Sequence, residues 1–238
     1  METTHKISSL RYRVIRKNRK NVSISIDEKG DIIVIAPWDI NYDSVEKIVK
    51  SKMDWIYKSK NIIKDKIEYM KSMGISQGEN MLWLGKLLEV KKCESDIKEC
   101  HVEVLNDKII IYGNSLLIKN QEAINKSIRK FYKEKSKIIF AEKVRFYAKK
   151  INVHPNKITV RCQKTRWGSC SSKGNLSFNY KLLMAPLDVI DYIVVHELCH
   201  LVYMDHSGGY WRMVGSIIPQ YLDKRNWLKN NGYMLRFP

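Results

Sequence analysis

Alternating hydrophobic and polar residues mark the start of the chain as β structure. Between residues 10 and 36 this period of two predicts two strands, and the second hydrophobic run ends at Pro37. Residues 43–73 change to a spacing of three and four, which predicts a helix. Its hydrophobic positions are Val45, Ile48, Val49, Met53, Ile56 and Tyr57.

Strand-like runs return at residues 80–92 and 100–112. Within the first run, Leu84-Gly85-Lys86 is turn chemistry and predicts a tight reversal of the chain. Together with the earlier elements, these runs predict a β-rich N-terminal subdomain, residues 1–114, with one helical segment.

The second half of the chain opens with the clearest helical pattern, over residues 120–150. Its hydrophobic side carries Ile124, Ile128, Phe131, Ile138, Phe140, Val144 and Tyr147, and many lysines lie between them. We interpret this segment as a helix that packs on the core and turns a solvated face outward. A helix that binds nucleic acid is the alternative.

Two strands, residues 157–162 and 175–180, are expected next, on either side of a turn at Trp167-Gly168-Ser169-Cys170. Pro186 suits the first turn of a helix, because its missing N–H leaves no hydrogen bond unmade there. We expect this last long helix to end at about Tyr203.

The charge of the chain is strongly positive. Lysine and arginine number 43 against 25 aspartate and glutamate, which gives a net charge of +18. Such a field attracts polyanions, so nucleic acid is an expected partner of the basic surface. A lysine-rich surface without such a partner explains the same count. Hydrophobic residues make up 44% and charged residues 29% of the chain, which excludes the disordered and fibrous classes.

Localisation follows from what the sequence lacks. The first twenty residues contain no apolar run typical of a signal peptide, and no stretch approaches the roughly 18 apolar residues that span a membrane. The five cysteines form no CxxC pair, which argues against a disulfide scaffold and against a four-cysteine zinc site. We therefore expect a cytoplasmic protein without a membrane span.

His196-Glu197-Leu198-Cys199-His200 is an HExxH motif inside the last long helix. A spacing of four places His196 and His200 one turn apart on one face, where both reach a single metal ion. Zinc prefers nitrogen and sulfur ligands, and a catalytic zinc keeps one position open for water. Glu197 lies beside the pair and can take a proton from that water. The motif predicts a zinc-dependent hydrolase with Glu197 as general base; a helix with two ordinary histidines is the simpler alternative.

His206 is the candidate third ligand. On a continuous helix it would lie about 120° from His200, so it reaches the same metal only after a helix end and a chain reversal. The residues Asp205-His206-Ser207-Gly208-Gly209 provide turn chemistry for that reversal. A turn histidine without a ligand role, and a more distant carboxylate such as Asp223, are the alternatives. Cys199 points off the metal-facing side, and we interpret it as a packing residue.

These motifs, in this order, resemble those of the YgjP-like family of zinc metallopeptidases, relatives of the SprT-like and WLM zincins. The matching segments are Trp167-Gly168-Ser169-Cys170, Asn175-Leu176-Ser177-Phe178-Asn179, Tyr192 to His200, His206-Ser207 and Tyr210-Trp211. The resemblance covers most of the chain. It implies an α+β fold with a zincin-like catalytic domain at residues 115–238, in which the HExxH helix packs on a small sheet. It also implies that His206 is the third ligand and that residues 175–180 line the active cleft.

The resulting hypothesis is a zinc metallopeptidase in which Glu197 activates zinc-bound water to cleave a peptide or protein substrate. The positive charge extends this hypothesis to proteins associated with nucleic acid. An exposed strand edge at residues 175–180 is expected to hold the extended peptide. Tyr203 and Tyr210 are candidates to assist the developing oxyanion, and both also suit packing.

Two rival functions use the same residues differently. A metal-dependent nucleotide phosphohydrolase would grip phosphates with basic residues such as Arg161, Lys164 and Arg166. A non-enzymatic nucleic-acid-binding module would hold a structural metal. The intact Glu197 argues against that second rival, because a structural site has no use for a base.

Overall fold

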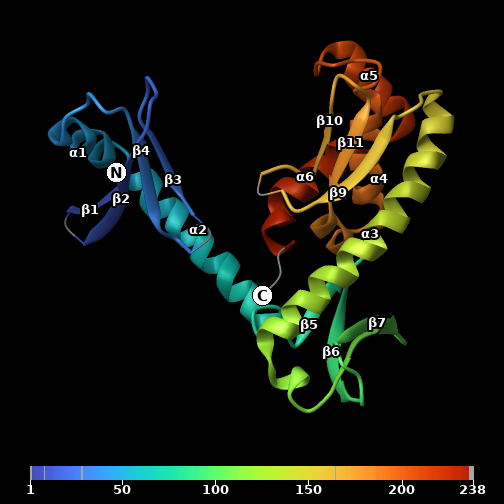
Figure 1. Ribbon diagram of the computed structural model, residues 1–238. Helices are drawn as coiled ribbons and strands as arrows, with labels where there is room; N and C mark the ends of the chain where they lie inside the picture. Colours follow the sequence, from blue (N-terminus) through green and yellow to red (C-terminus); the bar gives the residue numbers. More distant parts are fainter. Residues whose placement is uncertain (1, 8, 28, 164, 236–238) are drawn as a thin grey trace. The chain divides into compact units, whose positions relative to one another are not determined.

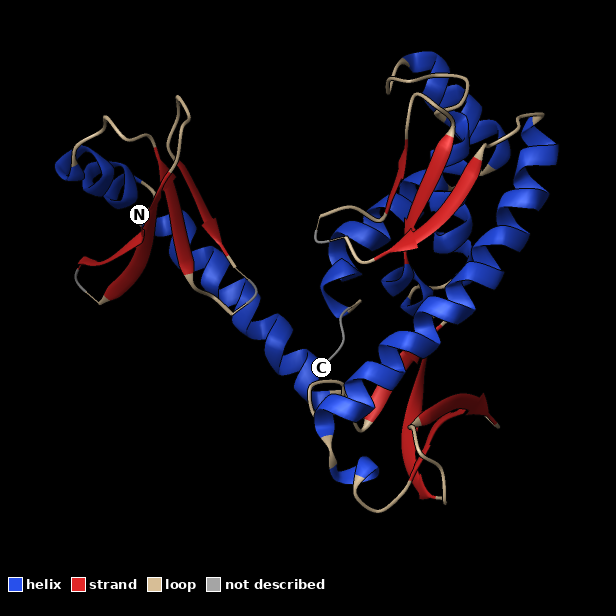
Figure 2. Ribbon diagram, viewed as in Figure 1, coloured by secondary structure: helices blue, strands red, loops and turns tan. Residues whose placement is uncertain are grey.

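The structure is a computed structural model that describes residues 2–7, 9–27, 29–163 and 165–235. The chain forms two compact units, Met1–Ser72 and Met73–Pro238 (Figure 1). Both units combine helices with small sheets, which confirms the α+β class (Figure 2). The domain boundary at residues 114/115 stays a prediction; by their contacts, the strands of residues 80–113 belong to the unit that contains the HExxH helix.

The first unit consists of one four-stranded sheet and two helices. Its strands are β1 (Glu2–Ile7), β2 (Leu10–Arg16), β3 (Ser23–Ile26) and β4 (Ile32–Ala36), in the order β1-β2-β4-β3. Only the β2–β4 pair is parallel. Helix α1 (Tyr42–Ser51) begins after Asn41, whose side chain accepts a hydrogen bond from the Ser44 amide, and α2 (Met53–Ser72) follows.

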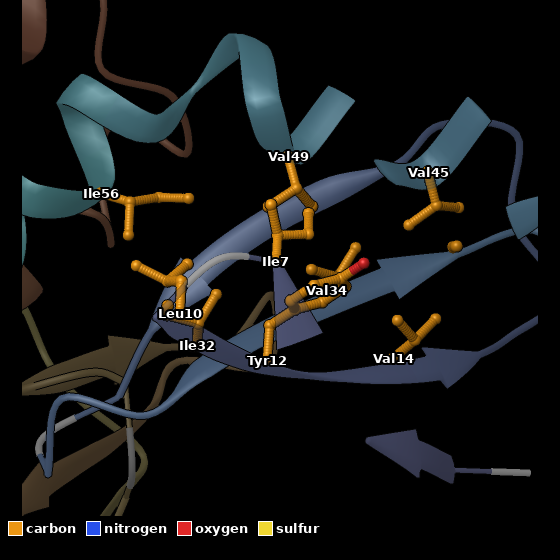
Figure 3. Packing of buried hydrophobic residues seen from close by; sticks show 10 residues of the cluster. Ile7, Leu10, Tyr12, Val14, Ile32, Val34, Val45, Val49 and Ile56 are labelled. Atoms are coloured by element: carbon orange, nitrogen blue, oxygen red, sulfur yellow. The ribbon is translucent and has the colours of Figure 1, made fainter. Parts of the chain in front are cut away.

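The core of this unit lies between the sheet and the helices (Figure 3). Val14 and Val34 from the sheet and Val45 and Val49 from α1 are fully buried. Alternate strand residues face this core because successive side chains of a strand point to opposite faces. The alternation reveals which faces are buried but does not show where the chain reverses.

Two expectations for the first unit need correction. Residues 10–36 form three strands where the pattern predicted two, and β1 precedes them. The predicted helix over 43–73 is divided at Lys52, whose amide bonds back to Val49 and Lys50 and so leaves the α-helical pattern.

The second unit begins with a four-stranded sheet, in the order β5-β6-β8-β7. Its strands are β5 (Asn80–Trp83), β6 (Lys86–Glu94), β7 (His101–Leu105) and β8 (Lys108–Gly113). The β structure predicted at 80–92 is confirmed, and so is the turn between β5 and β6. The run at 100–112 forms two strands where the pattern indicated one, because the chain turns at Asn106 and Asp107, which have positive φ angles of 50° and 54°. Leu84 and Gly85 in that turn have positive φ angles of 49° and 85°, a conformation that favours glycine.

The β5–β6 turn packs on the segment that leads into the HExxH helix. The amides of Leu84 and Gly85 donate hydrogen bonds of 2.7 and 3.2 Å to the carbonyls of Leu183 and Met184. A Cβ atom on Gly85 would lie 2.8 Å from the Cα atom of Pro186. This turn therefore holds the start of the HExxH helix through backbone contacts.

Helix α3 (Gln121–Ile151) is the longest element and confirms the prediction for residues 120–150. The side chain of Asn120 caps its first turn, and Asn152 ends it in the left-handed conformation. Phe140 is fully buried and stacks on Phe178 at 4.7 Å, whereas most lysines of the helix are exposed. The helix packs on α4 and on β9, as a core-packing helix should.

A second, three-stranded sheet has the order β10-β11-β9. Its strands are β9 (Lys157–Arg161), β10 (Gly168–Cys170) and β11 (Asn175–Asn179). The predicted turn at residues 167–170 is wrong: residues 168–170 are a strand, and the reversal occurs at Gly174, which has a positive φ of 72°. The expectation of an exposed edge at residues 175–180 is also wrong, because β11 pairs on both sides and the edge strands are β10 and β9.

Three helices complete the second unit: α4 (Leu187–Cys199), α5 (Gly208–Ile217) and α6 (Tyr221–Asn231). The short helical turns are η1 (Leu117–Lys119), η2 (Tyr180–Met184) and η3 (Gly232–Met234). Helix α4 ends four residues before the predicted Tyr203, because the next amides bond back only three residues, as from Leu201 to Leu198. Among the described residues, no helix is long and apolar enough to cross a membrane.

Candidate metal centre

The HExxH motif occupies the last turn of α4. His196 and Glu197 lie inside the helix, and His200 is the residue that caps its end. Glu197 is only 4% exposed, and Cys199 is fully buried as expected for a packing residue. Helix α4 contacts α3, α5, α6 and β10, so the motif sits on a helix that is held from several sides.

The chain reversal after α4 brings His206 back to the two motif histidines. One ligand atom from each of His196, His200 and His206 lies within 4.8 Å of the other two. The Nε2 atoms of His196 and His206 are 3.4 Å apart. Asp223, the alternative third ligand, lies on α6 and is not part of this cluster. The structure therefore brings together the three predicted histidines.

The hydrogen bond of His200 leaves the lone pair of its Nε2 atom free for a metal. Nδ1 of His200 lies 3.0 Å from the carbonyl oxygen of Tyr203, and a carbonyl accepts only, so Nδ1 carries the proton. Nε2 of His200 is then the unprotonated nitrogen. A hydrogen bond from the other ring nitrogen commonly orients a metal-binding histidine in this way. The donor set fits a metal ion that prefers nitrogen ligands.

Aromatic rings enclose the histidine cluster. Tyr210 stacks on His200 at 4.7 Å, and its hydroxyl donates a 3.1 Å hydrogen bond to the carbonyl oxygen of His196. Trp211 stacks on His206 at 5.5 Å, and Tyr221 stacks on Trp211 at 5.3 Å. The guanidinium of Arg225 lies 5.1 Å from the Trp211 ring centroid. This stack packs against one side of His206, which is the exposed histidine of the cluster.

Burial and neighbouring charges favour the neutral forms of His196 and His206. Burial, followed by the neighbouring His200 and His206, lowers the pKa of His196 from 6.5 to about 3. Burial also lowers the pKa of His206, with His200 and Arg225 acting in the same direction. Unprotonated imidazole is the form that binds metal, so these side chains need not lose a proton at neutral pH.

A cavity of about 510 Å³ opens beside the cluster and is lined by all three histidines, Glu197 and strand β10. Burial raises the pKa of Glu197 from 4.5 to about 8, and Arg166 opposes this shift. A buried carboxyl group at the wall of such a cavity can hold or release a proton near neutral pH.

Sequence reasoning assigned no role at this site to two residues that the structure places there. Gly168 lies against the Glu197 carboxylate, and Trp211 stacks on His206. Both residues belong to the matched family motifs, but the spacing of those motifs does not encode these contacts. Of the basic residues expected to grip phosphates, Arg166 lines the cavity, Arg161 does not, and Lys164 lies outside the described residues. The Tyr210 hydroxyl is already bonded to the backbone, and Tyr203 does not line the cavity.

Known proteins place the chain in a family. Among solved structures, it matches the crystal structure of the metallopeptidase zymogen of Pyrococcus abyssi abylysin, with 20% identity and a TM-score of 0.35. That match covers 38% of this chain and 93% of the other. None of the curated proteins matches this chain. Residues 20–231 match the family described as YgjP-like, metallopeptidase domain, and because this match spans most of the sequence, the chain belongs to the YgjP-like metallopeptidases.

Proposed function

We propose that this metallopeptidase uses zinc, held by His196, His200 and His206. The observation that carries the proposal is the convergence of three imidazoles, with one ligand atom of each within 4.8 Å of the other two. Three nitrogen ligands and an open fourth position suit a catalytic zinc ion. Magnesium and calcium prefer oxygen ligands, which this cluster does not offer.

Glu197 is the general base in this proposal. A bound zinc ion would polarise the scissile carbonyl and acidify water. Glu197 is the only carboxylate among the described residues that line the cavity, so it accepts the proton of the attacking water and passes it to the leaving amine. Burial favours the protonated carboxyl group, whereas a nearby cation favours the carboxylate. These opposing effects suit a group that must take up and release a proton in each cycle.

Strand β10 is the candidate binding edge for the peptide. All three of its residues, Gly168, Ser169 and Cys170, line the cavity that contains Glu197. The strand pairs with β11 on one side and is the edge of its sheet on the other. An extended peptide can add to such an edge through main-chain hydrogen bonds. This arrangement favours a peptide over a nucleotide as the substrate.

We further propose that the substrates include proteins bound to nucleic acid, on the strength of the basic face of α3. Lys126, Lys130, Lys133 and Lys137 are exposed and follow one another at intervals of four and three, which places them on one side of the helix. A row of cations on a rigid helix suits a phosphate backbone. We expect the protein to bind duplex DNA with an affinity that falls steeply as the salt concentration rises. This binding should be lost when the four lysines are replaced by glutamate.

The cysteines support a reducing cytoplasm as the location. All five lie within the described residues, and all are free thiols. Free thiols persist in a reducing compartment, whereas an oxidising one favours disulfides.

The decisive experiment measures metal and activity together. The purified protein should hold about one equivalent of zinc and should cleave an unstructured protein. Glu197→Gln should retain the zinc and lose the cleavage, because the ligands remain and the base is gone. A protein that shows no affinity for zinc, or a Glu197→Gln variant that cleaves at the wild-type rate, would refute the proposal.

A further inference from the structure

We propose that Arg166 binds a carboxylate of the substrate peptide, so that the enzyme prefers chains with an acidic group beside the cleaved bond. The acidic group is either an aspartate or glutamate side chain or a free C-terminus. This inference rests on the proposed peptidase function and adds the chemical class of its substrate.

The backbone of Arg166 is held in place at the rim of the cavity. Asn179, at the end of β11, is 2% exposed, and its side-chain amide donates to the carbonyls of Gln163 and Arg166 at 2.8 and 3.2 Å. Its backbone amide donates to the carbonyl of Trp167 at 2.9 Å. A buried side chain that makes hydrogen bonds to the Gln163 and Arg166 carbonyls fixes the backbone at these two residues. The Arg166 side chain therefore starts from an ordered position.

Arg166 is the one cationic side chain among the described residues that line this cavity. Glu197 is the one anionic side chain there, and the other walls are neutral or apolar, including Trp167, Ile193 and Met204. A bound metal dication would add two positive charges to the single positive charge of Arg166, whereas Glu197 contributes one negative charge. The cavity then has a net positive charge that a substrate carboxylate would neutralise.

Among the described residues, the Arg166 guanidinium has no ion-pair partner. The side chain of Arg166 is exposed. Arg166 and Glu197 line the same cavity. Arg166 therefore lies at the wall of the proposed active site and keeps its charge available for a ligand.

A carboxylate fits this site better than a phosphate does. The planar guanidinium forms two parallel hydrogen bonds with a carboxylate, so one arginine suffices to recognise it. Phosphate chains carry more charge and are usually bound by several cations or by a loop of backbone amides. The described lining offers a single cation.

The test compares peptides that differ in one group. One pair carries aspartate or asparagine next to the scissile bond, and a second pair has a free or an amidated C-terminus close to it. The zinc-loaded enzyme should cleave the acidic member of one pair with about tenfold or greater kcat/KM. Arg166→Gln should remove this ratio, and Arg166→Glu should invert it in favour of a lysine peptide. Arg161→Gln, a neighbouring exposed arginine outside the cavity, should preserve the ratio.

Peptide binding separates this inference from the peptidase function itself. In a Glu197→Gln background, fluorescence anisotropy should show tighter binding of the acidic peptide, and Arg166→Gln should abolish the difference. Preferential binding without any cleavage by the zinc-loaded wild type would refute the peptidase but support the carboxylate site. Three results would overturn the carboxylate site. The first is equal binding and equal cleavage of both members of every pair, and the second is an unchanged ratio in Arg166→Gln. The third is displacement of the bound probe peptide by a nucleoside triphosphate but not by the acidic peptide.

Discussion

A Cβ atom on Gly168 would lie 2.5 Å from Oε1 and 2.7 Å from Cγ of Glu197. No side chain other than hydrogen fits in that space while Glu197 keeps its position. The backbone of Gly168 does not adopt the positive φ that would favour glycine, so space alone requires this residue. The Trp167-Gly168-Ser169-Cys170 motif thus has a physical role, because it brings strand β10 directly against Glu197, the proposed general base.

Gly168→Ala should therefore displace the Glu197 carboxyl group without removing any metal ligand. We expect kcat to fall by about tenfold to a hundredfold, since a shift of about 1 Å in a catalytic group has effects of that size. The zinc content should stay at the wild-type value. Gly215→Ala on α5 is the matched control, because its added Cβ meets Tyr221 at an ordinary 3.5 Å. Wild-type kcat in Gly168→Ala would contradict the assigned contact.

Because Trp211 stacks on His206, we expect Trp211 to contribute measurably to the zinc affinity of the site. Trp211→Leu should weaken zinc binding by about tenfold, because groups that orient a ligand typically contribute that much. His206→Ala, which removes the ligand itself, should have a larger effect. Competition with a chelator of known affinity measures both. Trp55→Leu, a half-exposed tryptophan of the first unit, should leave zinc affinity unchanged. An effect of Trp211→Leu no greater than that of Trp55→Leu would remove Trp211 from the metal centre.

Glu197 should make the metal-free protein less stable as pH rises. Its pKa is about 8 in the folded state, because of burial, and about 4.5 in an unfolded chain. Between these values the folded state holds a proton that the unfolded state has released, so stability is full below pH 4.5 and is lost as pH rises toward 8. The lowered pKa of His196 acts only below pH 6.5, and it acts in the opposite direction.

The interval from pH 6.5 to 8 therefore isolates the effect of Glu197. Over this interval the free energy of unfolding should fall by up to about 2 kcal/mol. Urea denaturation in the presence of a chelator measures it at both ends of the interval. Glu197→Gln should flatten the dependence and should be more stable than the wild type at the upper end. Equal slopes in the two proteins would show that Glu197 is ionised in the metal-free fold.

Gly85→Ala should destabilise the second unit. The added Cβ would lie 2.8 Å from the Pro186 backbone, and the positive φ of 85° disfavours alanine as well. We expect a loss of about 2–4 kcal/mol in the free energy of unfolding. Gly174→Ala is the control, because its φ is similarly positive at 72° and its nearest neighbour lies at 3.4 Å. It should lose only about 1 kcal/mol, so equal losses would mean that the turn does not hold α4.

Local patterns predicted much of the fold. Residues 120–150 and the HExxH helix are helical because their hydrophobic residues recur at helical spacing, and that signal is contained within each segment. The turn at 167–170 was misassigned because glycine and serine suit both a turn and a close contact. Whether glycine is needed for a turn or for space depends on what lies across from it, which here is Glu197.

The sequence by itself determined the pairing of His196 and His200 with Glu197, since the helical repeat places them together whatever the rest of the chain does. It also indicated that His206 needed a chain reversal to join them. Only the tertiary structure decided that the reversal brings His206 within 4.8 Å of the other ligand atoms, with Trp211 stacked on it. Only the tertiary structure, too, made β10 an edge strand of its sheet and placed it against Glu197. These relationships join segments distant in sequence, and their geometry depends on how whole elements pack, which no local spacing encodes.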